Sequence, residues 1–224
     1  SLVRALALLL ALAVPAPALA CRLALVLALD TSSSVDAREY DLQRDGLAAA
    51  LLAPEVVAAF LSDPEPVALA AFEWSGQWNQ REVLGWRMIR TRDDLERSAA
   101  ELALAVRGAT GFPTAIGPAL GYAATMLQDG PDCAARTVDL SGDGRHNHGY
   151  APALAFKHFA FDGVRVNALA IGSGAEGDAL VDYYKSEVIR GPNAFVERAM
   201  DHADFERAMR RKLEREVARA LEIG

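Results

Sequence analysis

The sequence is poor in basic residues and in cysteine, and its long apolar runs are confined to the first 20 positions. Among 224 residues, 23 are Lys or Arg and 30 are Asp or Glu, which gives a formal net charge of −7. Without a basic stripe to neutralise phosphates, the chain is not expected to bind nucleic acid or an anionic membrane surface. No later run reaches the ~20 apolar residues of a transmembrane helix. A length of 224 residues fits one globular domain with a full core.

Residues 1–20 have the layout of a secretory signal peptide. Arg4 precedes an apolar run over 5–14, and Ala18 and Ala20 supply the small side chains that a leader peptidase needs. Removal of the leader would make the net charge one unit more negative, because Arg4 is its one charged residue. We therefore predict an exported protein, periplasmic or secreted, with a single domain over 21–224.

Two cysteines, Cys21 and Cys133, are present, and export makes their pairing feasible. Cys21 lies nine residues before Asp30, and Cys133 lies ten before Asp143. If the strands between them are parallel neighbours with level ends, both cysteines meet at the opposite end, so we predict a Cys21–Cys133 disulfide. It would stabilise the fold by on the order of 4 kcal/mol. Alternatively, Cys21 is the acylated cysteine of a lipoprotein, although the two residues at −3 and −2 reverse the usual lipobox order.

After the leader, strand-like and helix-like stretches alternate, which is typical of βαβ units. Strands are expected over 23–29, 66–72, 82–89, 136–141, 164–171 and 194–197, and helices over 36–52, 54–61, 93–106, 114–127, 150–159, 178–188 and 204–221, with a flexible loop over 172–177. With right-handed crossovers, this order predicts an α/β fold. We expect a doubly wound, mostly parallel sheet of about six strands with helices on both faces.

Oxygen-bearing side chains follow three of these stretches. Asp30, Ser32 and Ser34 come directly after the apolar run 23–29, Thr114 precedes a helix, and Asp143 lies in Ser-Gly-Asp-Gly after another strand. In α/β sheets ligands bind beyond the carboxyl ends of the strands. Hydroxyl and carboxylate oxygens suit Mg²⁺ or Mn²⁺. A second interpretation is that the serines only cap the helix that follows.

This pattern resembles the metal-ion-dependent adhesion site of von Willebrand factor type A domains. D-x-S-x-S, a later Thr before a helix and Asp-Gly after a strand occur in order along the whole mature chain. Further stretches are similar to a bacterial exported family of unknown function that carries this domain. They are Cys-x-Leu-Ala-Leu-Val-Leu-Ala-Leu-Asp, Val-Asp-Leu-Ser-Gly-Asp-Gly, Val-Ile-Arg-Gly-Pro-Asn-Ala-Phe-Val and Asp-Phe-x-x-Ala-Met-Arg-Arg-Lys-Leu.

The resemblance implies a role for each ligand. Ser32 and Ser34 would bind the cation directly, Asp30 and Asp143 chiefly through water, and Thr114 directly when the site is engaged. The cation would then accept an Asp or Glu carboxylate from a partner protein. We accordingly expect a metal-dependent protein-binding module, and we predict no catalytic turnover.

The sequence departs from the family pattern next to Asp143. Gly142 stands where many such domains have Thr, and His146 and His148 replace the expected Asn or acidic residues. A metal-dependent hydrolase using Asp143 with His146 and His148 is therefore the alternative function, since imidazole suits zinc. No serine-nucleophile elbow is present, and the glycine-rich stretch 172–177 lacks the Lys-Ser/Thr ending of a phosphate loop.

Other polar and aromatic residues leave questions open. Asp139 lies in a strand on the same face as Asp143, where an unpaired carboxylate would be costly, and the sequence does not identify its partner. The charged stripe of the last helix is interpreted as a solvated face. Trp74, Trp78 and Trp86 gather around the second hairpin. They form either core and edge packing or an aromatic contact surface near the metal.

Overall fold

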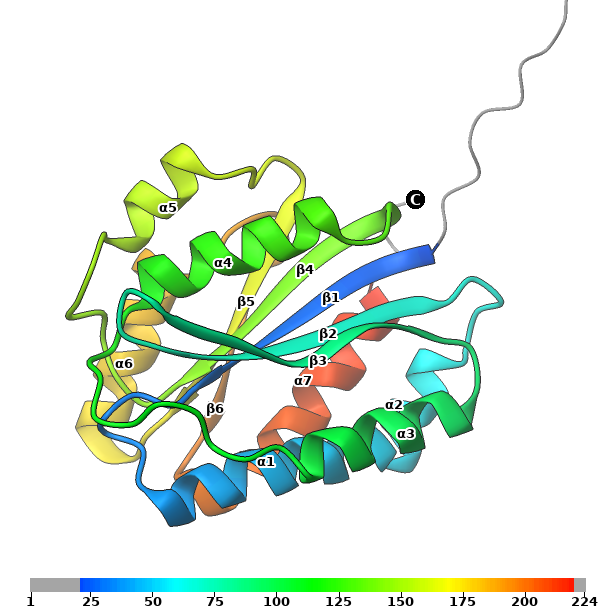
Figure 1. Cartoon of the computed structure of the whole chain (residues 1–224), viewed down its shortest axis with the longest axis horizontal. Coiled ribbons are helices and arrows are strands. Elements are labelled where there is room, and N and C mark those ends of the chain that lie inside the picture. Colours follow the sequence, from blue (N-terminus) through cyan, green and yellow to red (C-terminus); the bar gives the residue numbers. More distant parts are fainter. Residues whose placement is uncertain (1–20, 220–224) are drawn as a thin grey trace, which may run out of the picture.

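A computed structural model describes residues 21–219 of the chain; the predicted leader (1–20) and residues 220–224 lie outside the described part. Six strands form one sheet in the order β3-β2-β1-β4-β5-β6, and all neighbours are parallel except the antiparallel pair β2 and β3 (Figure 1). The strands are β1 (Cys21–Asp30), β2 (Val67–Ser75), β3 (Asn79–Ile89), β4 (Cys133–Gly142), β5 (Val164–Ile171) and β6 (Val196–Ala199). The predicted α/β sheet is confirmed.

Helices cover both faces of the sheet and divide its core into two apolar clusters. The helices are α1 (Ala37–Leu52), α2 (Pro54–Phe60), α3 (Arg92–Ala103), α4 (Ile116–Asp129), α5 (Pro152–His158), α6 (Gly174–Glu187) and α7 (Phe205–Arg219), with a short 3₁₀ turn η1 (His202–Asp204) before α7. One face carries α1, α2, α3 and α7, and the other carries α4, α5 and α6. No helix within residues 21–219 is long and apolar enough to cross a membrane.

Strand β1 lies at the centre of the sheet and is buried along all ten of its residues. Its register with β4 pairs Cys21 with Cys133 at one end and Leu29 with Ser141 at the other. The two cysteines form a disulfide, as predicted from their spacing, and no free cysteine is found in the described chain. The same register sets Asp30 level with the end of β4, so that Asp143 follows immediately beyond it.

Two local predictions are wrong. The hairpin turn is shorter than the gap between the expected strands 66–72 and 82–89, because β2 continues to Ser75 and β3 already begins at Asn79. The loop expected over 172–177 is mostly helix, since α6 begins at Gly174. Glycine disfavours helix in isolation. Here the Arg198 side chain donates to the carbonyls of Gly172 (2.9 Å) and Gly174 (3.1 Å), and these contacts hold the helix start against β6.

The last helix contributes charged groups to the interior, which corrects its interpretation as a solvated face. Lys212 is fully buried, and its ammonium lies 2.7 Å from an Asp139 carboxylate oxygen and 2.5 Å from one of Glu216. The Asn167 amide donates to that same Glu216 oxygen at 2.8 Å. We call Asp139, Asn167, Lys212 and Glu216 the closed cluster. The partner of Asp139 is therefore a lysine distant in sequence.

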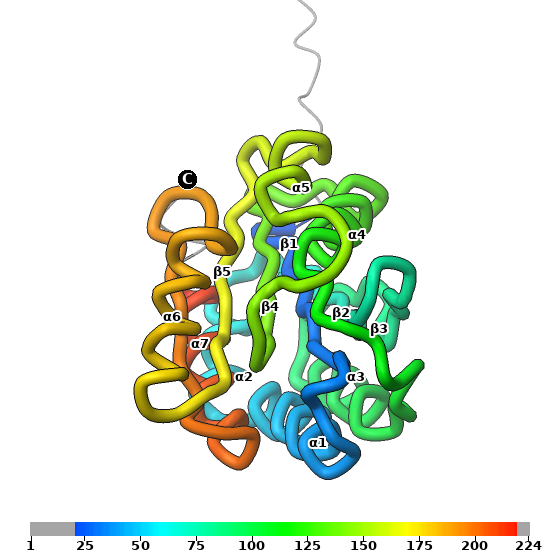
Figure 2. The backbone as a smooth tube through the Cα atoms, turned by 90° about the vertical axis from the view of Figure 1, so that its left-hand side faces the viewer, coloured from blue at the N-terminus to red at the C-terminus, as the bar shows by residue number. Residues whose placement is uncertain are grey.

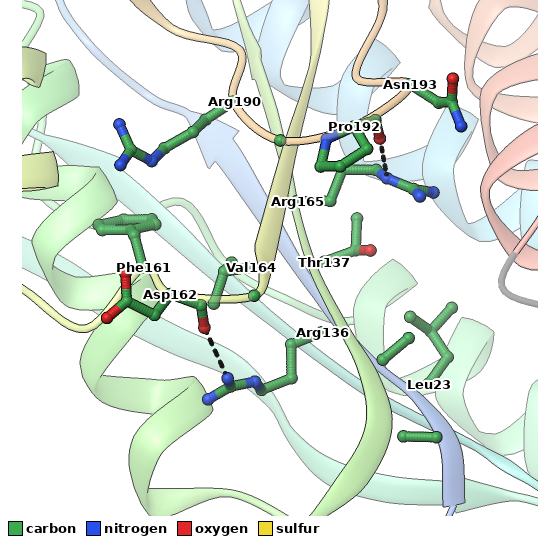
Figure 3. A pocket seen from close by; sticks show the side chains of 14 residues that line it. Leu23, Arg136, Thr137, Phe161, Asp162, Val164, Arg165, Arg190, Pro192 and Asn193 are labelled. Atoms are coloured by element: carbon green, nitrogen blue, oxygen red, sulfur yellow. Dashed lines mark hydrogen bonds between the residues drawn. The ribbon is translucent and has the colours of Figure 1, made fainter. Parts of the chain in front are cut away.

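A hollow of about 480 Å³ lies where β4 and β5 begin (Figure 3). Arg136 and Arg165 line it, but both donate to backbone carbonyls, those of Asp162 (2.8 Å) and Pro192 (3.0 Å). These arginines thereby fasten neighbouring loops. The hollow is distant from the carboxyl ends of the strands, where the predicted metal ligands lie.

Candidate metal site

The five predicted ligands meet at the carboxyl ends of β1 and β4, the side of the molecule that faces the viewer in Figure 2. Asp30 ends β1 and is completely buried. The loop after it turns sharply, because the Ser32 backbone N–H donates to the Asp30 carboxylate (Oδ1) at 2.7 Å. From α1, Gln43 donates its side-chain amide to the Asp30 carbonyl at 3.3 Å.

Hydroxyl groups connect the loops. The Ser32 and Ser34 oxygens lie 3.1 Å apart, and the Ser34 hydroxyl donates to Asp143 Oδ1 at 2.6 Å. On the other side, the Thr114 hydroxyl donates to Ser32 Oγ at 3.3 Å. A continuous chain of oxygens thus runs from Thr114 to Asp143. The structure brings together all five residues, and helix capping does not account for the serines, because Asp36 is the N-cap of α1.

Two residues that were not identified from the sequence hold these loops in place. The Asn147 side chain accepts from the Thr114 backbone N–H at 2.9 Å, and the Asn147 N–H donates to the Thr114 carbonyl at 2.9 Å. Arg107 extends beneath the loop after β1 and donates to the carbonyls of Thr31 and Ser32, each at 3.4 Å, and to that of Val35. The sequence positions of Asn147 and Arg107 follow no motif that would indicate that they hold these loops.

Asp30 is a buried carboxyl group that has no ion-pair partner among residues 21–219. Burial, with the like charge of Asp143 as a second cause, raises the pKa of Asp30 to about 7. Its second oxygen, Oδ2, is buried and has no hydrogen-bond partner among the described residues. A buried carboxylate without compensation is costly. Three hydroxyls and two carboxylates on adjoining loops, one carboxylate oxygen being unsatisfied, are a donor set that fits a hard divalent cation.

Gly142 packs tightly against Asp30 and Tyr184. This packing explains why a glycine stands where many von Willebrand factor type A domains have Thr. A Cβ atom at this position would lie 2.7 Å from the Tyr184 hydroxyl and 2.9 Å from Asp30 Oδ2. Tyr184 comes from α6, is fully buried and donates to the Gly144 carbonyl at 3.1 Å. A threonine therefore has no room here, because the tyrosine hydroxyl already occupies the space beside Asp30.

His202 is a further neighbour that the sequence did not indicate. It lies in η1, is buried, and its Nδ1 is 3.3 Å from Glu39 Oε1. Its other ring nitrogen, Nε2, lies 3.9 Å from Asp143 Oδ2. The histidine thus fills the space between α1 and the loop after β4, at the start of the segment that leads into α7.

His146 and His148 do not form a zinc centre with Asp143. The His146 Nδ1 accepts from the Gly117 backbone N–H at 3.5 Å, at the start of α4. Burial lowers the pKa of His146. Within residues 21–219, no group of three or more His, Cys, Asp or Glu side chains converges to hold a metal. Of the three tryptophans, Trp74 is buried in the core, Trp86 packs partly buried against it, and Trp78 is 84% exposed.

Residues 20–221 match the model of a family described as "Protein of unknown function (DUF1194)". The chain belongs to this family. No curated protein matches its sequence.

Similarity to solved structures shows that this chain has the fold of a von Willebrand factor type A domain. Proximal thread matrix protein 1 from the mussel byssus is 17% identical, with a TM-score of 0.61 over 91% of this chain and 49% of its own. A von Willebrand factor type A protein from Catenulispora acidiphila is 16% identical, with a TM-score of 0.57 over 90% and 43%. The manganese-loaded TRAP protein of Plasmodium vivax is 18% identical, with a TM-score of 0.53 over 88% and 74%. The chain spans about half the length of the first two.

Proposed function

We propose that this protein is an exported, divalent-metal-dependent binding module that recognises a carboxylate of a protein partner. Asp30, Ser32, Ser34, Thr114 and Asp143 would hold Mg²⁺ or Mn²⁺ at the carboxyl ends of β1 and β4. The observation that carries the proposal is the buried, unpaired Oδ2 of Asp30 at the start of a loop whose hydroxyls form a chain from Thr114 to Asp143. A bound cation would supply the positive charge there and an open coordination position for an Asp or Glu side chain.

The chain's own residues prepare this site in three ways. Arg107 and Asn147 hold the loops that bear the serines and Thr114. Ser32, Ser34 and Thr114 would contribute neutral oxygens, and Asp30 is buried. A cation would therefore retain a demand for a further anionic ligand. Ser34 is exposed beside Asp143, and a partner could therefore reach the site from solvent.

Descriptions of related folds support metal binding and also broaden the choice of metal. A second structure of the mussel protein, 18% identical, is described as having a zinc-occupied MIDAS motif, and the TRAP structure is described as manganese-loaded. Export is supported by the Cys21–Cys133 disulfide, because disulfides persist in oxidising compartments. We propose no catalytic turnover, and the positions of His146 and His148 give the hydrolase alternative no support.

Calorimetric titration of chelator-treated protein with Mg²⁺, Mn²⁺ and Zn²⁺ tests this function. We expect saturable binding of one ion, lost in the double variant Asp30→Ala, Ser32→Ala. Glu176→Gln is the matched control, because it removes an exposed carboxylate that borders the same end of the sheet outside the ligand set. Wild-type protein that binds none of the three ions would refute the proposal, and zinc binding retained in the double variant would redirect it to the histidines.

A further inference from the structure

Some of the exposed apolar side chains belong to segments that adjoin the loop of the candidate ligands. Eight large apolar side chains within residues 21–219 are exposed, and four of them belong to two segments. Trp78 lies in the turn between β2 and β3, and Leu104, Val106 and Phe112 lie between α3 and α4. We call these four residues the apolar rim. Apolar groups gathered in this way mark interaction surfaces, unlike scattered ones.

Backbone hydrogen bonds join the apolar rim to the loop that bears the ligands. The Ser33 N–H, between the two ligand serines, donates to the Phe112 carbonyl at 2.7 Å. The Gly76 N–H, in the turn that carries Trp78, donates to the Pro113 carbonyl at 2.7 Å. Gly76 has a positive φ of 52°, and a Cβ there would lie 3.2 Å from Phe112 Cβ, so glycine permits this close contact. Phe112 and the turn that carries Trp78 therefore adjoin the loop that bears the ligands.

A hollow of about 270 Å³ lies between the site and Trp78. Thr31, which separates the ligands Asp30 and Ser32, forms one wall, and Trp78 and Gly108 form others. The carboxylate in this hollow, that of Glu73, is already compensated. It accepts from the Tyr40 hydroxyl (2.5 Å), from Arg81 (2.8 Å) and from the Gly108 N–H (3.1 Å). Ser75, Asn79 and Gln80 add polar walls, and Trp78 is the one large apolar side chain that lines the hollow.

We propose that Trp78 and this hollow receive an aromatic or large aliphatic side chain of the partner, from the same segment as the acidic side chain that reaches the metal. This inference rests on the proposed function and names the partner's chemistry: an acidic residue close in sequence to an apolar one. Tryptophan is enriched among residues that dominate binding energy, and a ring 84% exposed has most of its area still to bury. Because the turn that carries Trp78 adjoins the loop that bears the ligands, one segment reaches both.

Selection from a random dodecapeptide display library tests the inference. Wild-type protein, Trp78→Ala, Asp143→Ala and the control Leu61→Ala are each panned in Mg²⁺ and eluted with a chelator. Leu61 is an exposed apolar residue after α2, remote from the carboxyl ends of the strands. Because Trp78 is so exposed, its replacement leaves the core intact. We expect wild type and Leu61→Ala to enrich acidic residues next to aromatic or large aliphatic ones, and Trp78→Ala to enrich acidic residues alone.

The outcomes separate the two proposals. Metal-dependent enrichment of acidic residues with no apolar neighbour, or with the same neighbour in Trp78→Ala, would overturn this inference and leave the metal function intact. No metal-dependent enrichment of acidic residues by the wild type would refute both. For a single selected peptide, we expect Trp78→Ala to weaken binding about tenfold, measured by calorimetry, and Leu61→Ala to leave it unchanged. A wild type that dimerises through Trp78 in sedimentation experiments would assign the surface to a second copy of the chain.

Discussion

Two clusters of buried or partly buried carboxylates lie close together along β4, and they differ in where their positive charge comes from. In the closed cluster, Asp139 and Glu216 share the ammonium of Lys212. At the candidate metal site, Asp30 and Asp143 form no ion pair with any Lys or Arg of residues 21–219, and one Asp30 oxygen is unpaired. The fold thus compensates one pair with its own lysine, whereas the other pair, Asp30 and Asp143, would take its positive charge from the proposed cation; we call this second pair with Ser32, Ser34 and Thr114 the open cluster.

The largest effect should come from opening the closed cluster. Lys212→Met leaves Asp139 and Glu216 buried side by side without a cation, which is expected to cost about 3–5 kcal/mol of unfolding free energy. Denaturant unfolding monitored by circular dichroism measures this loss. Adding Asp139→Asn and Glu216→Gln to Lys212→Met should restore most of it, because no buried charge is then left without a partner. Equal loss in the single and triple variants would show that packing, and not charge, explains the cost.

Filling the open cluster should have the next largest effect. At one hundred times its dissociation constant, a bound cation raises the unfolding free energy by about 2.7 kcal/mol. We expect this gain in denaturant unfolding of wild type and Glu176→Gln. Asp143→Ala should not show it. A gain of equal size in Asp143→Ala would place the cation elsewhere in the protein.

Crowding Asp30 with a larger residue at position 142 should have a smaller effect. In Gly142→Ala the new methyl group meets both the Tyr184 hydroxyl and Asp30 Oδ2, and overpacking of this kind costs about 1–3 kcal/mol. We also expect weaker metal binding, measured by calorimetry, because Asp30 must move. Tyr184→Phe added to Gly142→Ala should recover part of the stability. Gly142→Ala with unchanged stability would contradict the close packing described here.

Taken over a single pH unit, the titration of the closed cluster should give the smallest effect. Burial, and then the charge of Asp139, raises the pKa of Glu216 above its ordinary value. The folded protein then holds a proton that the unfolded chain releases above about pH 4.3. Stability should therefore fall as pH rises from there through neutrality, by up to about 1.4 kcal/mol per pH unit. Glu216→Gln should remove this slope in unfolding measured from pH 5 to 8. A slope retained in Glu216→Gln would assign it to another group.

The open cluster was predictable from the sequence to a much larger extent than the closed one. Asp30 to Ser34 follow an apolar run directly, and the rule that ligands lie beyond the carboxyl ends of strands placed Asp143 with them. The resemblance to the adhesion-site pattern added Thr114. The partner of Asp139 was not predictable. Lys212 and Glu216 are four residues apart in a charged helix, a spacing that is common on solvated helix surfaces. Their burial depends on how α7 packs against the sheet, which local patterns do not encode.

Asn147 and His202 were missed for the same physical reason. Each acts through a contact with a loop distant in sequence, Asn147 with Thr114 and His202 with Asp143. Tyr184 was missed although its consequence was visible, because Gly142 already departed from the family pattern. An unexpected glycine beside a predicted ligand was therefore a sequence signal that another side chain occupies its space.

The disulfide has a mechanical consequence for a binding module of this kind. Cys21 and Cys133 link the starts of β1 and β4, while Asp30 and Asp143 lie where the same two strands end. A pull between the metal site and the amino-terminal end of β1 would load these central strands along their length. Their parallel hydrogen bonds would then resist in shear, all at once, and the covalent link would divide the tension between both strands. Reduction of the bridge would leave β1 to carry that load alone.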